Sequence, residues 1–378
     1  MLDVTNVPPR LRLLLIENSL DMTGAFVSAL ALTSALRSDY DIEFVLPATS
    51  PLRPRVEAAG IVCHLLPMRE LGRAWPRLLH YMPALLFNTV RLHRLLARRR
   101  TDILIINDYY NLLGAMVKAT GWNGRLFTYV RLMPLNQHRW LNRVWTALAV
   151  SHSDKVVAVS RAVARQLPQS RKVQVVYVSD SFKEHYPAIT VGNDQGMVRC
   201  LYLANYIAGK GHLSALQAFA RAHGEQPGLR LRFVGGVMGL EKNRQLKSSL
   251  ERTAMQMGLD RVVDFAGYSD DVEREIKRSD IVLNFSESES FSHTCLEACA
   301  FGRPVIATRC GGPEEIVESG VSGLLVSVGD VAAMANAILA LASDRMSRQR
   351  MGAAGRSLVK EKFAEQHFVS TFKELCEC

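Results

Sequence analysis

The 378-residue chain lacks long apolar runs and has few cysteines. No stretch approaches the roughly 18 consecutive apolar residues that a membrane-spanning helix needs, so we expect no such helix. The first residues, Met1 to Val4, lack the basic start and apolar stretch of a secretory signal peptide, which predicts a cytoplasmic protein. The seven cysteines show no paired Cys-x-x-Cys spacing, which favours free, mostly buried thiols over zinc ligands or disulfides.

Acidic residues are scarce relative to basic ones in the first half of the chain. Residues 1–190 hold 24 Lys and Arg against 13 Asp and Glu, whereas the remainder holds 22 against 23. Between Arg69 and Arg100, eight arginines and the single acid Glu70 are interleaved with apolar residues such as Trp75 and Phe87. This segment fits either a basic amphipathic helix on an anionic membrane or a core helix with an arginine-rich solvent face. Nucleic-acid binding is disfavoured, because the arginines lack the surrounding module of a DNA or RNA reader.

The chain alternates short apolar runs with helical patterns, which is typical of an α/β fold whose parallel strands are covered by helices. Strands are predicted at 11–16, 42–46, 61–66, 102–106, 126–130, 156–159 and 173–178, then at 198–204, 229–234, 262–265, 281–285 and 305–308. The polar stretch from Ser179 to Met197 is the predicted linker. We expect two Rossmann-like domains that face each other across a cleft, at 1–185 and 186–364, and a final helix at 365–378 that could pack back on the first.

Two carboxylates mark the most informative stretch, Glu289 to Thr308. The stretch reads as a loop with Glu289, a helix with Glu297, a glycine stop and a buried strand. Ser290 and Ser292 can cap free N–H groups at the start of the helix. A helix N-terminus at a strand end is an anion site, because its first amides lack partners and its dipole end is positive. Carboxylates accept hydrogen bonds from vicinal hydroxyls, so the pair predicts a sugar-phosphate or nucleotide ligand.

Three blocks of the second half resemble the retaining glycosyltransferases of family four, which have the two-domain GT-B fold and use nucleotide-sugar donors. The blocks are Tyr202 to Gly211, Leu231 to Gly236, and Glu289 to Gly312 with its E-x7-E motif. The first half is similar only in the rhythm of its elements. The resemblance implies no cofactor besides the nucleotide diphosphate sugar itself. It also implies no metal, because charged side chains and backbone amides can do the work of an ion.

The resemblance gives several residues an expected role. Glu297 would bind the donor ribose, Glu289 would lie close to the transferred sugar, and Lys210 would neutralise the diphosphate as the glycosidic bond breaks. The alternative for all three is an ordinary solvated surface charge. Backbone amides would bind the sugar hydroxyls at Ser290, Phe291 and Ser292, and the diphosphate at His293, Thr294 and Cys295. The backbone at Gly235 and Gly236 would approach the nucleotide, and an ordinary turn is the equal alternative for this pair. The segment with Gly267 would contact the base, and the loop that ends at Gly24 would approach the donor phosphate.

The sequence departs from the family pattern at three strand ends. Asn205 stands where the family often has an arginine, so it can donate a hydrogen bond but supplies no positive charge; the substitutes considered are Arg303, Arg309 and Arg131. The first half has Asn107 and Arg131 where the family commonly has histidines. Three side chains of this region are expected to face the cleft, on the acceptor or donor-sugar side: Asp108, Tyr109 and Arg131.

The resemblance implies a retaining glycosyltransferase, and the basic first half favours a role in cell-surface polysaccharide biosynthesis. It would transfer a sugar from a UDP-, GDP- or ADP-linked donor to a glycan or polyprenyl-linked acceptor, in the cytoplasm or peripherally on the inner face of the cell membrane. Two other interpretations stay open: a catalytically silent sugar-nucleotide binding protein, and another GT-B enzyme such as a nucleotide-sugar epimerase. The loop after the first strand lacks a Gly-x-Gly-x-x-Gly fingerprint, which argues against an NAD-dependent dehydrogenase.

Overall fold

The computed structural model describes the chain except for residues 1–9, 69–74, 135–138, 179–195 and 378, and except for the side chains of 75–80 and 139–141. The chain forms two compact units, one of Met1–Ser179 with Phe368–Cys378 and one of Asp180–His367. The boundary expected between residues 185 and 186 lies outside the described residues. Each unit is built on one parallel sheet.

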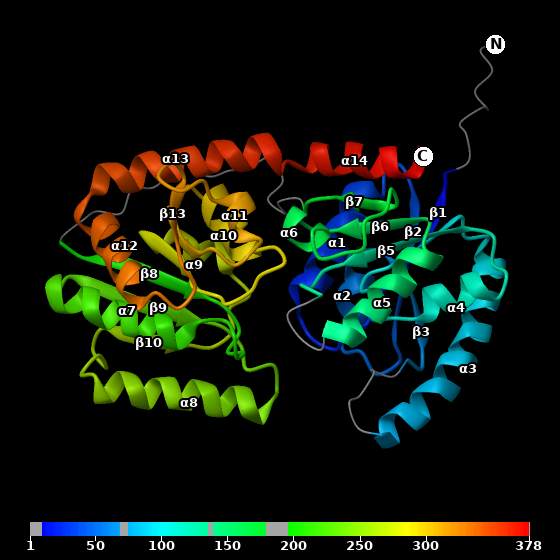
Figure 1. The fold of residues 1–378 in the computed structure, drawn as a ribbon, viewed down its shortest axis with the longest axis horizontal. Coiled ribbons are helices and arrows are strands. Elements are labelled where there is room, and N and C mark those ends of the chain that lie inside the picture. The colour runs from blue at the N-terminus through cyan, green and yellow to red at the C-terminus, as the bar shows by residue number, and fades with distance from the viewer. Residues whose placement is uncertain (1–9, 69–74, 135–138, 179–195, 378) are drawn as a thin grey trace, which may run out of the picture. The chain divides into compact units, whose positions relative to one another are not determined.

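The first unit has a seven-stranded sheet in the order β3-β2-β1-β4-β5-β6-β7 (Figure 1). Its strands are β1 (Arg12–Ile16), β2 (Asp41–Pro47), β3 (Val62–Leu66), β4 (Ile103–Ile106), β5 (Arg125–Val130), β6 (Lys155–Ala158) and β7 (Val173–Val175). Its helices are α1 (Gly24–Leu36), α2 (Arg53–Ala58), α3 (Trp75–Arg99), α4 (Leu113–Ala119), α5 (Arg139–His152), α6 (Arg161–Ala164) and most of α14 (Glu365–Glu377). All four residues of β4 are buried, as expected for a parallel strand covered on both faces.

One apolar cluster of the first unit lies between its sheet and the helices α3 and α4. Leu85 and Leu92 of α3 and Val117 of α4 pack in one apolar cluster with Leu14 of β1 and Leu104 of β4. The neighbouring helices α3, α4 and α5 contact one another in sequence order (Figure 1). The side of α3 that carries Leu85 and Leu92 is therefore needed to cover the sheet.

The final helix, α14, is tied to the first unit by aromatic and charged contacts. Phe372 is fully buried, and its ring centroid lies 5.8 Å from that of Tyr40 and 6.2 Å from that of Phe127. Lys373 Nζ lies 2.7 Å from Asp39 Oδ1. Aromatic burial of this kind contributes several times more to stability than an exposed ion pair.

The second unit has a six-stranded parallel sheet in the order β10-β9-β8-β11-β12-β13. Its strands are β8 (Val198–Leu203), β9 (Leu229–Val234), β10 (Val263–Ala266), β11 (Ile281–Asn284), β12 (Val305–Thr308) and β13 (Gly323–Val326). Its helices are α7 (His212–Glu225), α8 (Glu241–Gln256), α9 (Val272–Lys277), α10 (His293–Ala300), α11 (Pro313–Ile316), α12 (Val331–Ser343) and α13 (Arg345–Lys362). The predicted strands of both halves are confirmed to within a few residues, whereas β13, α12 and α13 were not predicted.

Helices cover both faces of the second sheet. Leu216 and Phe219 of α7 and Ile338 of α12 share an apolar cluster with Leu231 of β9 and Leu283 of β11. Helix α10 contacts α9, α11 and α13.

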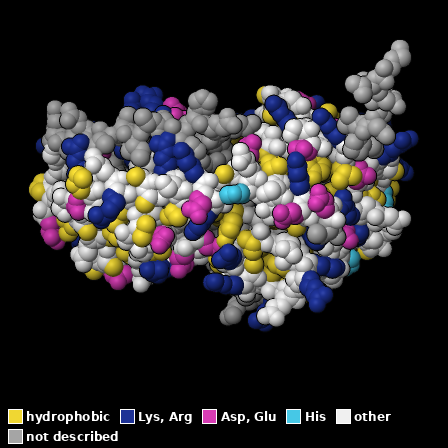
Figure 2. Space-filling view, turned by 90° about the horizontal axis from the view of Figure 1, so that it is seen from above, with side chains coloured by type: hydrophobic (Ala, Val, Ile, Leu, Met, Phe, Trp, Pro, Cys, Tyr) yellow, Lys and Arg dark blue, Asp and Glu magenta, His cyan; other side chains and the backbone are white. Residues whose placement is uncertain are grey.

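On the face shown in Figure 2, basic and acidic side chains are interspersed among apolar ones. Charge of one sign does not dominate that face.

Both sheets reverse their strand order once, between β1 and β4 in the first and between β8 and β11 in the second. At such a switch point, the loops after the two strands run to opposite faces of the sheet and leave a crevice at the carboxyl ends of the strands. The topology therefore favours one ligand position in each unit.

Candidate functional site

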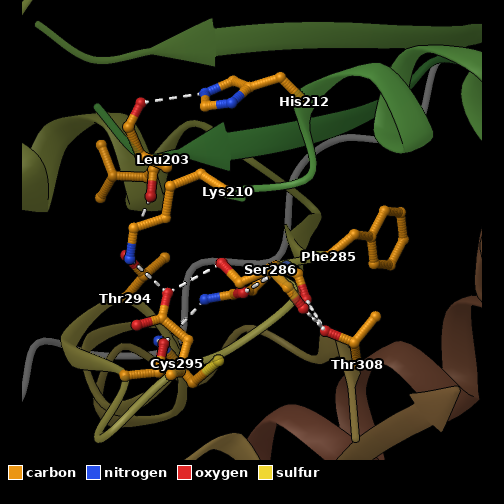
Figure 3. A network of polar contacts seen from close by, with 12 residues as sticks. Leu203, Lys210, His212, Phe285, Ser286, Thr294, Cys295 and Thr308 are labelled. Carbon is orange, nitrogen blue, oxygen red and sulfur yellow. Dashed lines mark hydrogen bonds and ion pairs between the residues drawn. The ribbon is translucent and has the colours of Figure 1, made fainter. Parts of the chain in front are cut away.

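The switch point of the second sheet brings a lysine and a glutamate together. Lys210, in the loop after β8, places Nζ 2.6 Å from Oε1 of Glu289, in the loop after β11 (Figure 3). Ser286 Oγ donates to the same oxygen at 2.8 Å. The Lys210 side chain is 31% exposed and that of Glu289 12%. The positive charge is thus held at the edge of the sheet where an anionic ligand can reach it.

The two loops approach so closely that only glycine fits between them. Gly211 has φ of +72°, and a Cβ atom there would lie 1.9 Å from the carbonyl oxygen of Phe285. The buried hydroxyl of Tyr202 donates to the carbonyl of Lys210 and accepts from the N–H of Phe285 at 3.0 Å. This hydroxyl fixes the backbone of Lys210 to the end of β11.

The first turn of α10 is fixed to the ends of β8 and β11. Ser292 caps the helix, because its Oγ accepts from Cys295 N at 3.3 Å and from Asn284 Nδ2 at 2.8 Å. Thr294 Oγ1 donates to the carbonyl of Leu203 at 3.0 Å (Figure 3). The predicted serine cap is confirmed for Ser292. The Cys295 N–H pairs with this cap, so a diphosphate would have to share that amide with Ser292.

Glu297, one turn further along α10, has a different environment from Glu289. Burial raises the pKa of Glu297 from its usual 4.5 to about 8. Among the residues that the structure describes, none donates a hydrogen bond to this carboxyl group. A partly buried carboxyl without a donor is costly when charged, and hydroxyl groups of a ligand would relieve that cost.

The glycine pair after β9 has a structural reason of its own. A Cβ atom at Gly235 would lie 1.9 Å from the carbonyl oxygen of Ala204, and Gly235 N donates to Gly267 O at 3.2 Å. Gly236 N donates to Asn205 Oδ1 at 2.9 Å. Close packing against Ala204 accounts for glycine at position 235, and the approach of the nucleotide to the pair stays a prediction. Asn205 holds the turn and brings no positive charge to the site.

The arginines considered as substitutes lie in different places. Arg303 precedes β12 at the amino edge of the sheet and donates to the carbonyl of Lys277 at 2.8 Å. It lies at the opposite edge from Lys210, so it cannot replace the missing charge. Arg309 follows β12 at the carboxyl edge and is exposed. Arg131 belongs to the first unit.

The switch point of the first sheet holds a buried chain of polar side chains. Glu17, after β1, accepts from Asn107 Nδ2 and from Ser19 N and Oγ at 2.8 and 2.7 Å. Asn107, after β4, accepts from Arg131 Nε at 2.6 Å. Burial raises the pKa of Asp108 to about 7; hydrogen bonding from the N–H of residue 110 and the charge of Arg131 oppose this rise, and the charge of Glu17 adds to it.

Two other predicted residues of the first unit have structural partners. Tyr109 is 1% exposed, and its hydroxyl donates to Asn142 Oδ1 of α5 at 3.4 Å. Its ring lies inside the unit, against α5, and is not available at the surface as a residue that faces a cleft would be. Gly24 starts α1 directly after Thr23, whose Oγ1 accepts from Phe26 N at 3.2 Å.

Sequence reasoning did not single out Glu17, Ser286 or the hydroxyl of Tyr202. The signal for the first two was their position, since each is a polar residue placed directly after or just beyond a buried strand. Thr308 could have been found in the same way, because it ends β12 and its hydroxyl donates to Ser286 O at 2.5 Å. Within the described parts of the chain, no group of three or more His, Cys, Asp or Glu side chains is arranged to hold a metal ion.

Comparison with known proteins bears on both units. Residues 23–180 match the glycosyl transferase 4-like domain, and residues 192–358 match the glycosyl transferases group 1 family. The structure of Anabaena HepE, solved with UDP and glucose, is similar with a TM-score of 0.82 at 19% identity, over 97% of this chain and 100% of that one. The chain has the GT-B fold of glycosyltransferases. The predicted architecture of two Rossmann-like domains is thereby confirmed.

Curated relatives are similar to this chain over part of its length. N-acetyl-alpha-D-glucosaminyl L-malate synthase of Bacillus anthracis is 28% identical over 242 residues, which are 60% of this chain and 60% of that protein. The lipopolysaccharide core biosynthesis glycosyltransferase LpsE of Rhizobium meliloti is 27% identical over 173 residues, 46% of this chain and 48% of that protein. The chain thus matches between about half and 60% of the length of these relatives.

Proposed function

We propose that the protein is a retaining, metal-independent glycosyltransferase that moves a sugar from a nucleotide diphosphate sugar to a glycan or lipid-linked acceptor in cell-surface polysaccharide biosynthesis. The observation that carries the proposal is the Lys210 ammonium at the switch point, 2.6 Å from Glu289 and beside the start of α10. The family matches, the UDP and glucose in HepE, and the lipopolysaccharide role in the name of LpsE support it.

Donor binding would use groups of opposite character. The diphosphate, an anion, would lie against the Lys210 ammonium and the first-turn amides of α10, where the helix dipole is positive. The ribose hydroxyls would donate to Glu297, whose carboxyl lacks a donor among the described residues.

Chemistry would follow from stabilisation of the leaving group. As the bond between the anomeric carbon and the phosphate oxygen breaks, negative charge grows on the diphosphate, and Lys210 is placed to neutralise it. Glu289 already binds Lys210 and Ser286 through one oxygen, and its role would be to orient the lysine and contact the sugar. The acceptor hydroxyl would form the new bond on the face that the phosphate leaves, and the phosphate would take its proton, which preserves the anomeric configuration.

A two-stage experiment tests this proposal. Thermal unfolding with UDP, GDP and ADP identifies the base, because a ligand at 100 times its Kd stabilises a protein by about 2.7 kcal/mol. Release of that nucleotide from its sugar conjugates is then measured with glycan and polyprenyl-linked acceptors, with and without EDTA, and the anomeric configuration of the product is read from NMR coupling constants.

The outcomes separate the proposal from its rivals. Transfer that needs Lys210 and resists EDTA supports it, with Lys242→Ala on α8 as a matched control for the loss of one exposed lysine. Nucleotide binding without turnover on any acceptor would identify a silent binding protein. Conversion of the donor sugar without transfer would identify an epimerase.

A further inference from the structure

We propose that the outer face of α3 is a docking surface for an anionic lipid bilayer. The surface consists of Met82, Leu86, Phe87 and Val90, followed by Arg91, Arg94 and Arg98. This inference rests on the first unit alone, and its truth does not depend on the proposed glycosyl transfer.

The apolar part of this surface is not needed by the core. Helix α3 buries Leu85, Leu92 and Leu96 against the sheet. On its other side, four apolar side chains are about half exposed: Met82 at 49%, Leu86 and Phe87 at 55% each, and Val90 at 51%. Scattered exposed apolar residues are common, whereas four within about three turns of one helical face form a contiguous patch of the kind that marks an interaction site.

The basic part continues the same face. Leu86, Val90, Arg94 and Arg98 are spaced four residues apart, so they form one row along the helix. The described side chains of α3, from Tyr81 to Arg99, include no acidic residue. Among the described residues, no carboxylate lies within ion-pair distance of Arg91, Arg94 or Arg98. The Arg91 guanidinium lies 5.0 Å from the centroid of the Phe87 ring, so the apolar and basic parts are in contact.

A basic hollow extends this surface at the carboxyl end of α3. Arg98 and Arg99 line it together with Arg12 and Arg37. Its two lining acids are Asp41 and Glu43, and Glu43 is already paired with Arg99 at 2.8 Å. The hollow lies at the amino edge of the first sheet, opposite the edge that holds Glu17 and Asp108. A phosphate headgroup could therefore enter it without occupying the switch-point site.

An anionic bilayer complements both parts of the surface. Leu86, Phe87 and their apolar neighbours can enter the boundary between headgroups and acyl chains, while the arginines contact lipid phosphates. The same face of a second copy offers no carboxylate to these arginines, because the described side chains of α3 include no acidic residue, whereas an anionic bilayer offers phosphates. No described helix is both long enough and apolar enough to span a membrane, so this contact would be peripheral.

The test is co-sedimentation of the whole protein with vesicles of phosphatidylcholine alone and of phosphatidylcholine mixed with phosphatidylglycerol. Wild type is expected to bind the mixed vesicles only. The triple variant Arg91→Gln, Arg94→Gln, Arg98→Gln should bind them about 100-fold more weakly, because each basic residue near an anionic surface is worth about five-fold. The control triple Lys242→Gln, Arg252→Gln, Arg261→Gln removes three exposed charges of the second unit and should bind as wild type does. Only variants whose unfolding temperature equals that of the wild type are compared.

A second pair of variants tests insertion. Leu86→Gln with Phe87→Gln should abolish the binding that persists at high salt, because salt screens the arginines but not apolar burial. Met255→Gln with Met346→Gln, at sites that are 67% and 70% exposed, is the matched control. If the two triple variants lose the same amount of vesicle affinity, the net charge of the chain explains the binding and the proposal is overturned. A second outcome would also overturn the proposal. In it, the wild-type protein fails to bind vesicles but forms a dimer, and the double variant Leu86→Gln with Phe87→Gln is a monomer.

Discussion

The different environments of the two glutamates predict a pH-dependent donor affinity. Burial raises the pKa of Glu297 to about 8, because it disfavours the charged carboxylate. At pH 7 about one tenth of the molecules carry the charged carboxylate, and at pH 9 about nine tenths do. If ribose hydroxyls donate to the charged form, the apparent affinity should rise about ten-fold between these values, which is about 1.4 kcal/mol.

Isothermal titration of UDP-glucose measures this effect directly. Neither phosphate group of UDP-glucose has a second ionisation between pH 7 and pH 9, so the diphosphate contributes no proton in this range. Binding at pH 7 should release about one proton, and titrations in buffers of different ionisation enthalpy count it. The neutral variant Glu297→Gln should bind with the same affinity at pH 7 and pH 9. Glu225→Gln, at an exposed position at the end of α7, controls for the loss of one carboxylate.

The same shift has a consequence for stability with a definite sign. The folded protein holds the Glu297 proton up to about pH 8, whereas the unfolded chain loses it near 4.5. The folded state therefore binds more protons between these values, and this contribution to stability is full below pH 4.5 and lost as pH rises through 8. Glu297→Gln should gain thermal stability relative to wild type as pH rises. A wild-type affinity that does not change between pH 7 and 9 would refute the reasoning.

Three further predictions concern the loops around Lys210. Lys210→Ala should lower kcat by 100-fold or more and change the donor Kd less, because the lysine acts most on the departing phosphate. Nucleotide release measures kcat, and titration measures the Kd. Equal losses in kcat and in donor affinity would indicate that the lysine stabilises the bound donor and the transition state alike. Gly211→Ala should lower the unfolding temperature and the donor affinity together, since its Cβ would meet the Phe285 carbonyl at 1.9 Å. Tyr202→Phe should cost about 1–3 kcal/mol in denaturant unfolding, because it leaves the buried N–H of Phe285 without its acceptor; an unchanged midpoint would contradict that role.

Much of the fold could be predicted because parallel strands are short, continuous apolar runs. Strand β9 has the predicted bounds, Leu229–Val234. Helix α13 was missed because its sequence is polar and contains two glycines. The structure shows why they are there: a Cβ at Gly352 would lie 2.1 Å from Gly302 O, and one at Gly355 would lie 3.2 Å from the sulfur of Cys299. Close packing on α10 selects these glycines, and no local pattern reports a partner so distant in sequence.

The candidate site could be predicted in part for the same reason. Glu289 and Lys210 follow strands in sequence, so their meeting at one sheet edge was foreseeable once the strand order was known. The pairing of Cys295 N–H with the cap and the placement of Arg303 at the far edge depend on local geometry that residue type does not fix. Tyr109 was misjudged because its burial depends on α5, a helix that the sequence patterns did not reveal.

The contacts of α14 make the first unit a discontinuous domain, with the second unit inserted between its last strand and its last helix. A fragment that ends at residue 178 would lack Phe372 and would leave Tyr40 and Phe127 uncovered, whereas residues 196–362 form a continuous stretch within the second unit. Dissection of this protein for separate study therefore requires α14 to be joined by a linker to the fragment that ends at residue 178, while the second unit can be cut out as one piece.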